Sequence, residues 1–278
     1  MASRRLLLRC QRRWAQRAGF AVDAAGYLPT VRDNLREPLS ASALADFTAR
    51  GAGEFHDGER HAARMRAVHS SAAFGVNVFD HWSTADPAPL AQALRLPAPI
   101  RHLVFEPHLS TAAGGNPANP DIAIELTSGG LVVIECKFSE WLVPSRKRGN
   151  VFHERYFLPG PGAWQQAGLP ACQALADDLQ SGREYFRYLE ADQLLKHVLG
   201  LKAARQAGGA LVYLYFEWPG RTGLAHQAEL QRFADRVQSD ADFSSTTFQA
   251  LFAGLCQSVP SVEPGYLGYL QVRYMGHA

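Results

Sequence analysis

The sequence predicts an α/β fold in which a mixed central β-sheet is flanked by helices and follows a helical N-terminal region. Two observations carry this prediction. Helical patterns dominate residues 1–95, whereas apolar runs typical of strands begin only after residue 100. An apolar run at 131–138 is then followed by a helical segment and another apolar run at 210–218, an order typical of a crossover between strands of one sheet.

The composition is that of a globular protein with a sizeable core. The chain has 278 residues, 47% of them hydrophobic and 19% charged. The simplest division is a helical region over 1–95 packed on a core over 96–278, together forming one domain. Its four cysteines include no C-x-x-C pair, which argues against a zinc site or disulfide framework and favours a cytoplasmic setting.

Charge and hydropathy limit the choice of partners. The net charge is only +2, so a nucleic-acid partner would have to be held by local basic patches. No apolar run approaches the length of a transmembrane segment, so we expect no membrane partner. Six arginines precede the first acid, Asp23, which indicates a basic helical arm; an organelle-targeting segment is the alternative.

In the N-terminal region, Ser40 or Ser42 is expected to cap a short helix. Apolar residues at helical spacing predict a long helix over 59–82, with an interruption at Gly75. Residues 86–99 read as a proline-punctuated connector that contains a short helix.

The remaining elements follow from apolar runs and turn signals. Strands are expected at 101–109, 121–126, 131–138, 210–218 and 265–275. Helices are expected at 183–209, 224–238 and 248–259, and loops at 110–120 and 144–163.

The stretch NPDIAIELTSGGLVVIECKF, residues 119–138, predicts a hairpin with one polar patch. Side chains alternate between the two faces of a strand, so Glu135 and Lys137 share one face of the second strand. Asp121 lies at the start of the first strand, on the face that carries its polar residues. A three-residue turn at 128–130 would set Asp121 opposite Lys137, with Glu135 on the diagonal, whereas a two-residue turn would separate the acids. Because the Gly-Gly pair suits the longer turn, we expect the three side chains to meet.

Such a patch suits a divalent cation. Two carboxylates would repel one another, and hard oxygen ligands match Mg²⁺ or Mn²⁺, with the Cys136 carbonyl as a further candidate ligand. A neighbouring lysine can orient or deprotonate a water and stabilise charge on a phosphoryl oxygen. The alternative is an edge hairpin with a surface salt bridge.

Pro120-Asp121 followed by Glu135-Cys136-Lys137 resembles the PD-(D/E)xK nuclease superfamily, whose fold is restriction-endonuclease-like, and the chain resembles uncharacterised bacterial members of it. The resemblance covers about residues 100–218. It implies that Asp121 and Glu135 bind metal and that Lys137 activates or positions the attacking water.

The resemblance also implies a role for the helix after this strand. It suggests Gln193 as an active-site residue and Lys196 or His197 as phosphate contacts; alternatively, Gln193 lies on the polar stripe of an amphipathic helix. Members often add an upstream glutamate, for which Glu54 and Glu106 are equal candidates.

A basic loop directly after the 131–138 strand is a candidate contact for the DNA backbone, through Arg146, Lys147 and Arg148. An ordinary solvated loop is the alternative.

The leading hypothesis is therefore a metal-dependent nuclease, acting on DNA. Two others stay open: a nuclease-fold protein that binds nucleic acid without cutting it, and a subunit of a defence or repair complex that is silent alone. A homodimer is compatible with all three.

Overall fold

A five-stranded mixed sheet forms the centre of the computed structural model, which describes residues 2–50, 52–59, 61–111, 113–157, 160–204, 209–258 and 262–276. The strands are β1 (Ile100–Phe105), β2 (Ile122–Leu126), β3 (Leu131–Lys137), β4 (Gly209–Tyr215) and β5 (Asp242–Thr247), in that spatial order. The β1–β2 and β2–β3 pairs are antiparallel, and the β3–β4 and β4–β5 pairs are parallel. The predicted mixed α/β sheet is confirmed.

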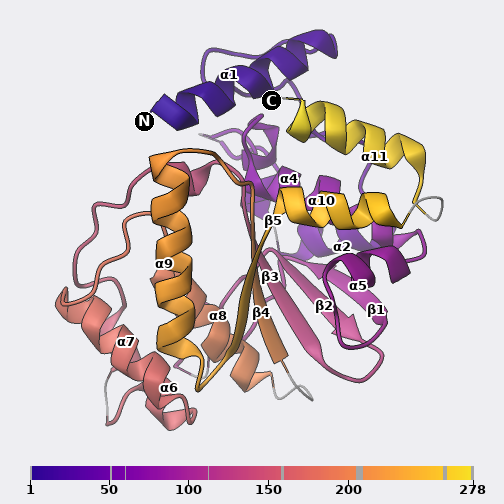
Figure 1. Ribbon diagram of the computed structural model, residues 1–278. Helices are drawn as coiled ribbons and strands as arrows, with labels where there is room; N and C mark the ends of the chain where they lie inside the picture. Colours follow the sequence, from indigo (N-terminus) through magenta and orange to yellow (C-terminus); the bar gives the residue numbers. More distant parts are fainter. Residues whose placement is uncertain are drawn as a thin grey trace.

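Helices cover both faces of this sheet (Figure 1). Those of the N-terminal part are α1 (Ala2–Arg17), α2 (Ala41–Arg50), α3 (Ala52–Phe55), α4 (Ser71–Phe79) and α5 (Ala88–Ala93). Those of the later part are α6 (Ala163–Gln166), α7 (Pro170–Ser181), α8 (Ala191–Ala203), α9 (Arg221–Val237), α10 (Phe248–Gln257) and α11 (Pro264–Leu270). Figure 1 shows α7, α8 and α9 together on one side and α4 and α10 on the other. None of the helices described is long and apolar enough to cross a lipid bilayer.

The crossover from β3 to β4 positions α8 over the sheet. A parallel pair needs a long connection, and here it carries α6, α7 and α8. Leu194, Leu195 and Val198 of α8 are buried in the core, which leaves Gln193 and Lys196 on a more accessible face. The predicted crossover is confirmed, although α7 was not anticipated.

The turn between β2 and β3 sets the register of the hairpin. The N–H of Leu126 donates to the Gly130 carbonyl at 2.9 Å, so the three-residue loop is 127–129 and not 128–130. Gly129 has φ 86°, the left-handed conformation that closes such a loop. The loop length is as predicted and the register is shifted by two residues. Because side chains alternate with a period of two, each one still lies on its predicted face.

The long helix predicted over 59–82 is wrong. A 3₁₀ turn occupies Arg64–Arg66, and α4 starts only at Ser71, where the Ser70 hydroxyl accepts the N–H of Ala73 at 3.1 Å. Gly75 does not interrupt α4. A Cβ built there would lie 3.5 Å from the Cys136 sulfur, an ordinary contact distance, so α4 packs directly on β3 at this position.

The helix predicted over 183–209 is shorter, since α8 begins at Ala191; Gly208, near its predicted end, lies outside the described residues. The strand predicted at 265–275 is also wrong. This segment forms α11 and a π-helical turn, Gln271–Met275, and its buried Tyr266, Leu270 and Tyr274 recur every four residues. β5 was not predicted, because its sequence DFSSTT carries almost no apolar signal.

Candidate active site at the ends of β2 and β3

Asp121 and Glu135 lie beside one another at the end of the β2–β3 hairpin. The β2–β3 ladder begins with Ile122 opposite Ile134. In the same register, Asp121, the residue directly before β2, lies beside Glu135. Asp121 is therefore not opposite Lys137, because the turn uses residues 127–129. Its Oδ2 accepts the N–H of Cys136 at 2.6 Å, which holds the carboxylate against β3.

Glu135 is a buried carboxylate with both oxygens engaged. Its Oε1 lies 2.9 Å from the Lys137 ammonium, and its Oε2 lies 2.9 Å from Nε2 of His197. Although burial opposes the charge, these two partners hold the pKa of Glu135 at about 2. The side chain is 2% exposed, so this arrangement fixes one ionised carboxylate inside the fold.

Lys137 brings together β3 and the start of α8. Its Nζ lies 2.9 Å from Glu135, 2.6 Å from Glu190 and 2.9 Å from the Gln193 side-chain oxygen. Burial alone would lower the pKa of Lys137, but the charges of Glu135 and Glu190 raise it well above its usual range. The group is therefore a cation with three fixed acceptors, and β3 and α8 do bring Lys137 and Gln193 together as expected.

Both upstream glutamate candidates lie near this cluster. Burial raises the pKa of Glu106 to about 8, and the charges of Glu54 and Glu135 add to the shift. The N–H of Glu106 donates to the Asp121 carbonyl at 2.9 Å. Glu54, on the short α3, accepts a 2.8 Å hydrogen bond from Arg64. The backbone of Glu106 is thus hydrogen-bonded directly to the backbone of Asp121. Glu54 lies close enough to Glu106 for its charge to raise the pKa of Glu106.

The backbone of Glu106 adopts an unusual conformation. Its φ is 48°, which non-glycine residues rarely adopt, and it precedes Pro107, which disfavours compact conformations at the preceding residue. Such positions persist only where the surroundings enforce them, and they concentrate at functional sites. Here the conformation turns the chain at the end of β1 beside Asp121.

The fit of this site to a metal ion depends on its donor chemistry. Within the described part of the chain, no group of three or more His, Cys, Asp or Glu side chains is arranged to hold a metal. However, Mg²⁺ is commonly held by one or two carboxylates together with water and substrate phosphates. Burial raises the pKa of Asp121 well above its usual range, and the charges of Glu135 and Glu106 raise it further. These crowded carboxyl groups therefore favour the protonated form, and a hard divalent cation in place of the proton would favour the charged form.

Cys136 has a different role from its neighbours. The side chain is buried, and burial raises the pKa of its thiol well above the usual value. It lies against α4, as the contact at Gly75 shows, so the thiol is not a nucleophile. The predicted contribution of its carbonyl to a metal stays a prediction.

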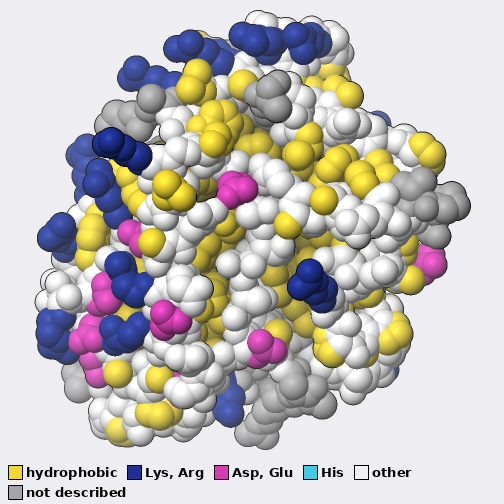
Figure 2. Space-filling model, viewed as in Figure 1, with side chains coloured by type: hydrophobic (Ala, Val, Ile, Leu, Met, Phe, Trp, Pro, Cys, Tyr) yellow, Lys and Arg dark blue, Asp and Glu magenta, His cyan; other side chains and the backbone are white. Residues whose placement is uncertain are grey.

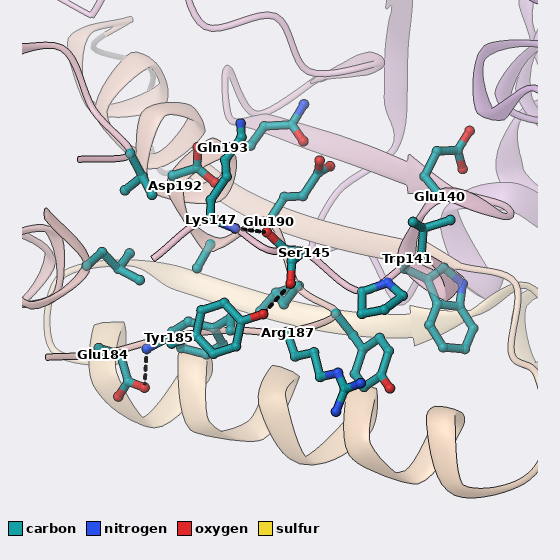
Figure 3. Close-up of a pocket in the computed structure, with 18 of the residues that line it drawn as sticks. Glu140, Trp141, Ser145, Lys147, Glu184, Tyr185, Arg187, Glu190, Asp192 and Gln193 are labelled. Carbon is teal, nitrogen blue, oxygen red and sulfur yellow. Dashed lines mark hydrogen bonds between the residues drawn. The ribbon is translucent and has the colours of Figure 1, made fainter. Parts of the chain in front are cut away.

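A pocket of about 540 Å³ opens beside Lys137 (Figure 3). Its walls come from the loop after β3, from 184–190 and from α8. Glu190 and Gln193 line it, as do Lys147 and Lys196. The hydroxyl of Tyr185 donates to the Ser145 carbonyl and closes one side. Arg187 lines the pocket as well, so a phosphodiester at Lys137 would have space and three further cations within it.

The predicted nucleic-acid contacts differ in accessibility. Arg146, Lys147 and Arg148 are exposed on the loop after β3, and the Arg148 guanidinium lies 4.6 Å from the centre of the Tyr185 ring. Lys196 is half-buried over the Phe152 ring at 5.8 Å. His197 is 2% exposed and bonded to Glu135, so its ring is not open to a phosphate.

Two acidic residues of this region were not predicted. Glu190 bonds Lys137, and its position three residues before Gln193 was the available signal, since residues at this spacing share a helix face. Glu229 of α9 is buried and accepts the backbone N–H groups of Arg187, Tyr188 and Leu189 at 2.8, 2.7 and 3.0 Å. No local pattern marks Glu229, because its three donors lie some forty positions earlier in the chain.

His226 of α9 packs behind the pocket. Its ring stacks on Trp141 at 4.3 Å, and its Nε2 lies 3.1 Å from the hydroxyl of Tyr213. Burial lowers the pKa of His226 to about 3. The ring is therefore neutral in the folded protein at pH values where it is charged in the unfolded chain.

This shift predicts a stability loss in acid. Between pH 6.5 and 3 the unfolded chain binds a proton at His226 that the folded protein does not, so the free energy of unfolding falls as the pH falls. From pH 7 to pH 5 we expect His226 to account for about 2 kcal/mol of that fall. Urea unfolding of wild type and His226→Gln at both pH values measures it. An equal loss in both proteins would contradict the prediction.

One comparison with known proteins gives a match. The family model described as "Restriction Endonuclease associating with ARP" matches residues 22–275. Searches of curated proteins and of solved structures found no significant match.

Proposed function

Because the chain belongs to the restriction endonuclease family described as associating with ARP, we propose that it hydrolyses phosphodiester bonds in DNA with the help of Mg²⁺ or Mn²⁺. The observation that carries the proposal is the Lys137 ammonium, held by Glu135 and Gln193. Beside it lie Asp121 and Glu106, two carboxyl groups whose pKa values are raised by burial and by neighbouring acids. A fixed cation next to acidic oxygens provides both halves of an electrostatic site for a phosphate.

The residues of the chain divide the work. The cation would be held by the carboxylates of Asp121, Glu106 and Glu135 and by the backbone carbonyl of Cys136. When bound, it would supply positive charge for the phosphate oxygens and lower the pKa of the attacking water. Lys137 donates to a phosphoryl oxygen or orients the water. Because the ammonium is paired and its pKa is raised, it acts as a donor and not as a base.

The surrounding side chains position this donor. His197 is hydrogen-bonded to one carboxylate oxygen of Glu135, and the other oxygen contacts the Lys137 ammonium. Gln193 adds a neutral acceptor that fixes the direction of the ammonium. Lys147 and Lys196, which line the same pocket, would contact flanking phosphates.

The test is cleavage of plasmid and linear DNA by the purified protein with Mg²⁺ and with a chelator, compared with Asp121→Asn. We expect cleavage only with the cation and a loss of roughly 10²-fold or more in the variant, since a metal carboxylate is removed. The matched control is Glu125→Gln, an exposed acid on β2, which should cleave like wild type. Equal rates for Asp121→Asn and wild type would overturn the assignment.

The family description favours one second candidate. It names association with a partner, so the chain would then be a subunit that cuts only within a complex. Wild type that binds DNA without cutting it, and cuts once a co-purified partner is added, would support this candidate over a free-standing nuclease.

A further inference from the structure

Four exposed arginines form a regular row on α1. Arg5, Arg9, Arg13 and Arg17 are all exposed and follow one another at i,i+4 spacing. Consecutive members are about 6 Å apart along the helix axis and turn only slightly around it. Figure 2 shows Lys and Arg side chains gathered along the top of the molecule, over the position of α1 in Figure 1. We call these four residues the arginine row.

The row is unfavourable for the helix on its own. Like charges at i,i+4 repel, and the positive end of the helix dipole adds to the repulsion in the first turn, where no acid occurs. Among the described residues, no carboxylate lies within ion-pair distance of these four guanidinium groups. The positive charge of the row is thus available to a partner.

The charge of the whole chain is concentrated here. The net charge is +2, and the first 17 residues hold six arginines and no acid, so the remainder of the chain carries −4. An anionic polymer would therefore be attracted more strongly to α1 than to the average of the remaining surface.

The opposite face of α1 is already occupied. Leu7 and Ala15 are fully buried, and the Trp14 ring lies 4.0 Å from the guanidinium of the buried Arg273. Gln11 donates to the Arg273 carbonyl at 3.1 Å. An amphipathic helix that inserts into a lipid surface needs its apolar face free, whereas a row of arginines above a docked face suits a partner that carries charge alone.

The helix that carries the row is linked through His69 to the residues that follow β3. Arg4 and Arg12 of α1 lie close enough to His69 that their charges help burial to lower its pKa. The His69 carbonyl accepts a 3.3 Å hydrogen bond from the Ser139 hydroxyl, two residues after Lys137. Hence the segment that contains His69 lies between α1 and the residues that follow β3.

We propose that the arginine row of α1 binds the phosphate backbone of the DNA that the active site cuts, and anchors it outside the cleavage position. The proposal rests on the proposed function for its choice of DNA, but it concerns binding alone. The row lies outside residues 22–275, the part that matches the family model, so it is a feature of this chain in addition to that match.

The test is the salt dependence of duplex DNA binding without divalent cations, so that cleavage does not interfere. Each arginine–phosphate contact contributes about 0.9 to the slope of log K against log salt. We expect the triple variant Arg5→Gln/Arg9→Gln/Arg13→Gln to lower the slope by about 3 and to bind roughly 10-fold to 100-fold more weakly at low salt. The matched control removes three exposed cations outside α1: Arg95→Gln, Arg101→Gln and Lys202→Gln. It should keep the wild-type slope.

The outcomes separate the two proposals. A row variant that binds DNA with the wild-type slope overturns the inference, whether or not the protein cuts DNA. A changed slope in a protein that cuts no DNA with Mg²⁺ supports the row and counts against the nuclease. Row-dependent binding to vesicles of anionic lipid, with DNA binding unchanged, would also overturn the inference.

Discussion

Lys137→Met should lose Mg²⁺-dependent DNA cleavage by roughly 10²-fold to 10³-fold, the typical effect of removing one preorganised donor from a transition state. The ammonium is the point at which Glu135, Glu190 and Gln193 meet. Methionine keeps the unbranched apolar stem, one atom shorter, but removes the charge and the donors. The single-turnover rate at saturating DNA measures the effect.

Two further measurements separate chemistry from folding. Removing one partner from a buried ion pair destabilises proteins by about 3–5 kcal/mol, so the urea unfolding of Lys137→Met must be recorded and the assay run where it is folded. DNA binding without cations should remain, because the arginine row is intact. Lys202→Met, an exposed lysine at the end of the same α8, should cleave like wild type. Full activity in folded Lys137→Met would contradict the assigned role.

The strand core and most of the site could be predicted because the signal is local. Two apolar runs around a glycine turn leave few options for 121–138, and alternation alone places the three polar groups on one face. The buried run at 210–218 likewise has only one interpretation as a strand. The register itself was missed by two residues, since sequence does not say which residue of the turn takes the left-handed conformation.

The parts that were missed depend on tertiary contacts. β5 is polar and half-exposed, and it is a strand because it pairs with β4, from Ala210 with Asp242 to Tyr215 with Thr247. The segment 264–275 is aromatic and glycine-containing, a composition that suits a strand, yet it packs as a helix that buries Tyr266 and Tyr274. Local propensity cannot reveal either outcome.

The same reason explains the residues missed at the site. Asp121 and Glu135 stand out because they occur at the ends of apolar runs, whereas Gln193 was suggested by the family resemblance. Glu190 stands directly before α8, and only its spacing of three residues from Gln193 marks it in the sequence. Its contact with Lys137 depends on how the chain before α8 is held. That stretch is held by Glu229, which comes from another helix.

Glu229→Ala should therefore destabilise the fold strongly. Its carboxylate accepts three backbone N–H groups, and a buried donor left without an acceptor costs about 1–3 kcal/mol. Arg187 and Tyr188 are partly accessible to water, so water can replace part of the loss, whereas Leu189 is 3% exposed. We expect a decrease of about 3 kcal/mol in the free energy of unfolding, measured by urea titration.

The substitution should also affect the active site, because Glu190 directly follows residues 187–189, whose backbone N–H groups Glu229 accepts. If Glu229 positions Glu190 and the start of α8, the cleavage rate at saturating DNA should fall in the folded variant while cation-independent DNA binding stays unchanged. Asp235→Asn is the matched control and should change neither quantity. This exposed acid lies on the same α9, and its carboxylate accepts a hydrogen bond from the Gln231 side chain. A destabilised Glu229→Ala with wild-type cleavage would show that this carboxylate serves the fold alone, and that α8 keeps its position without it.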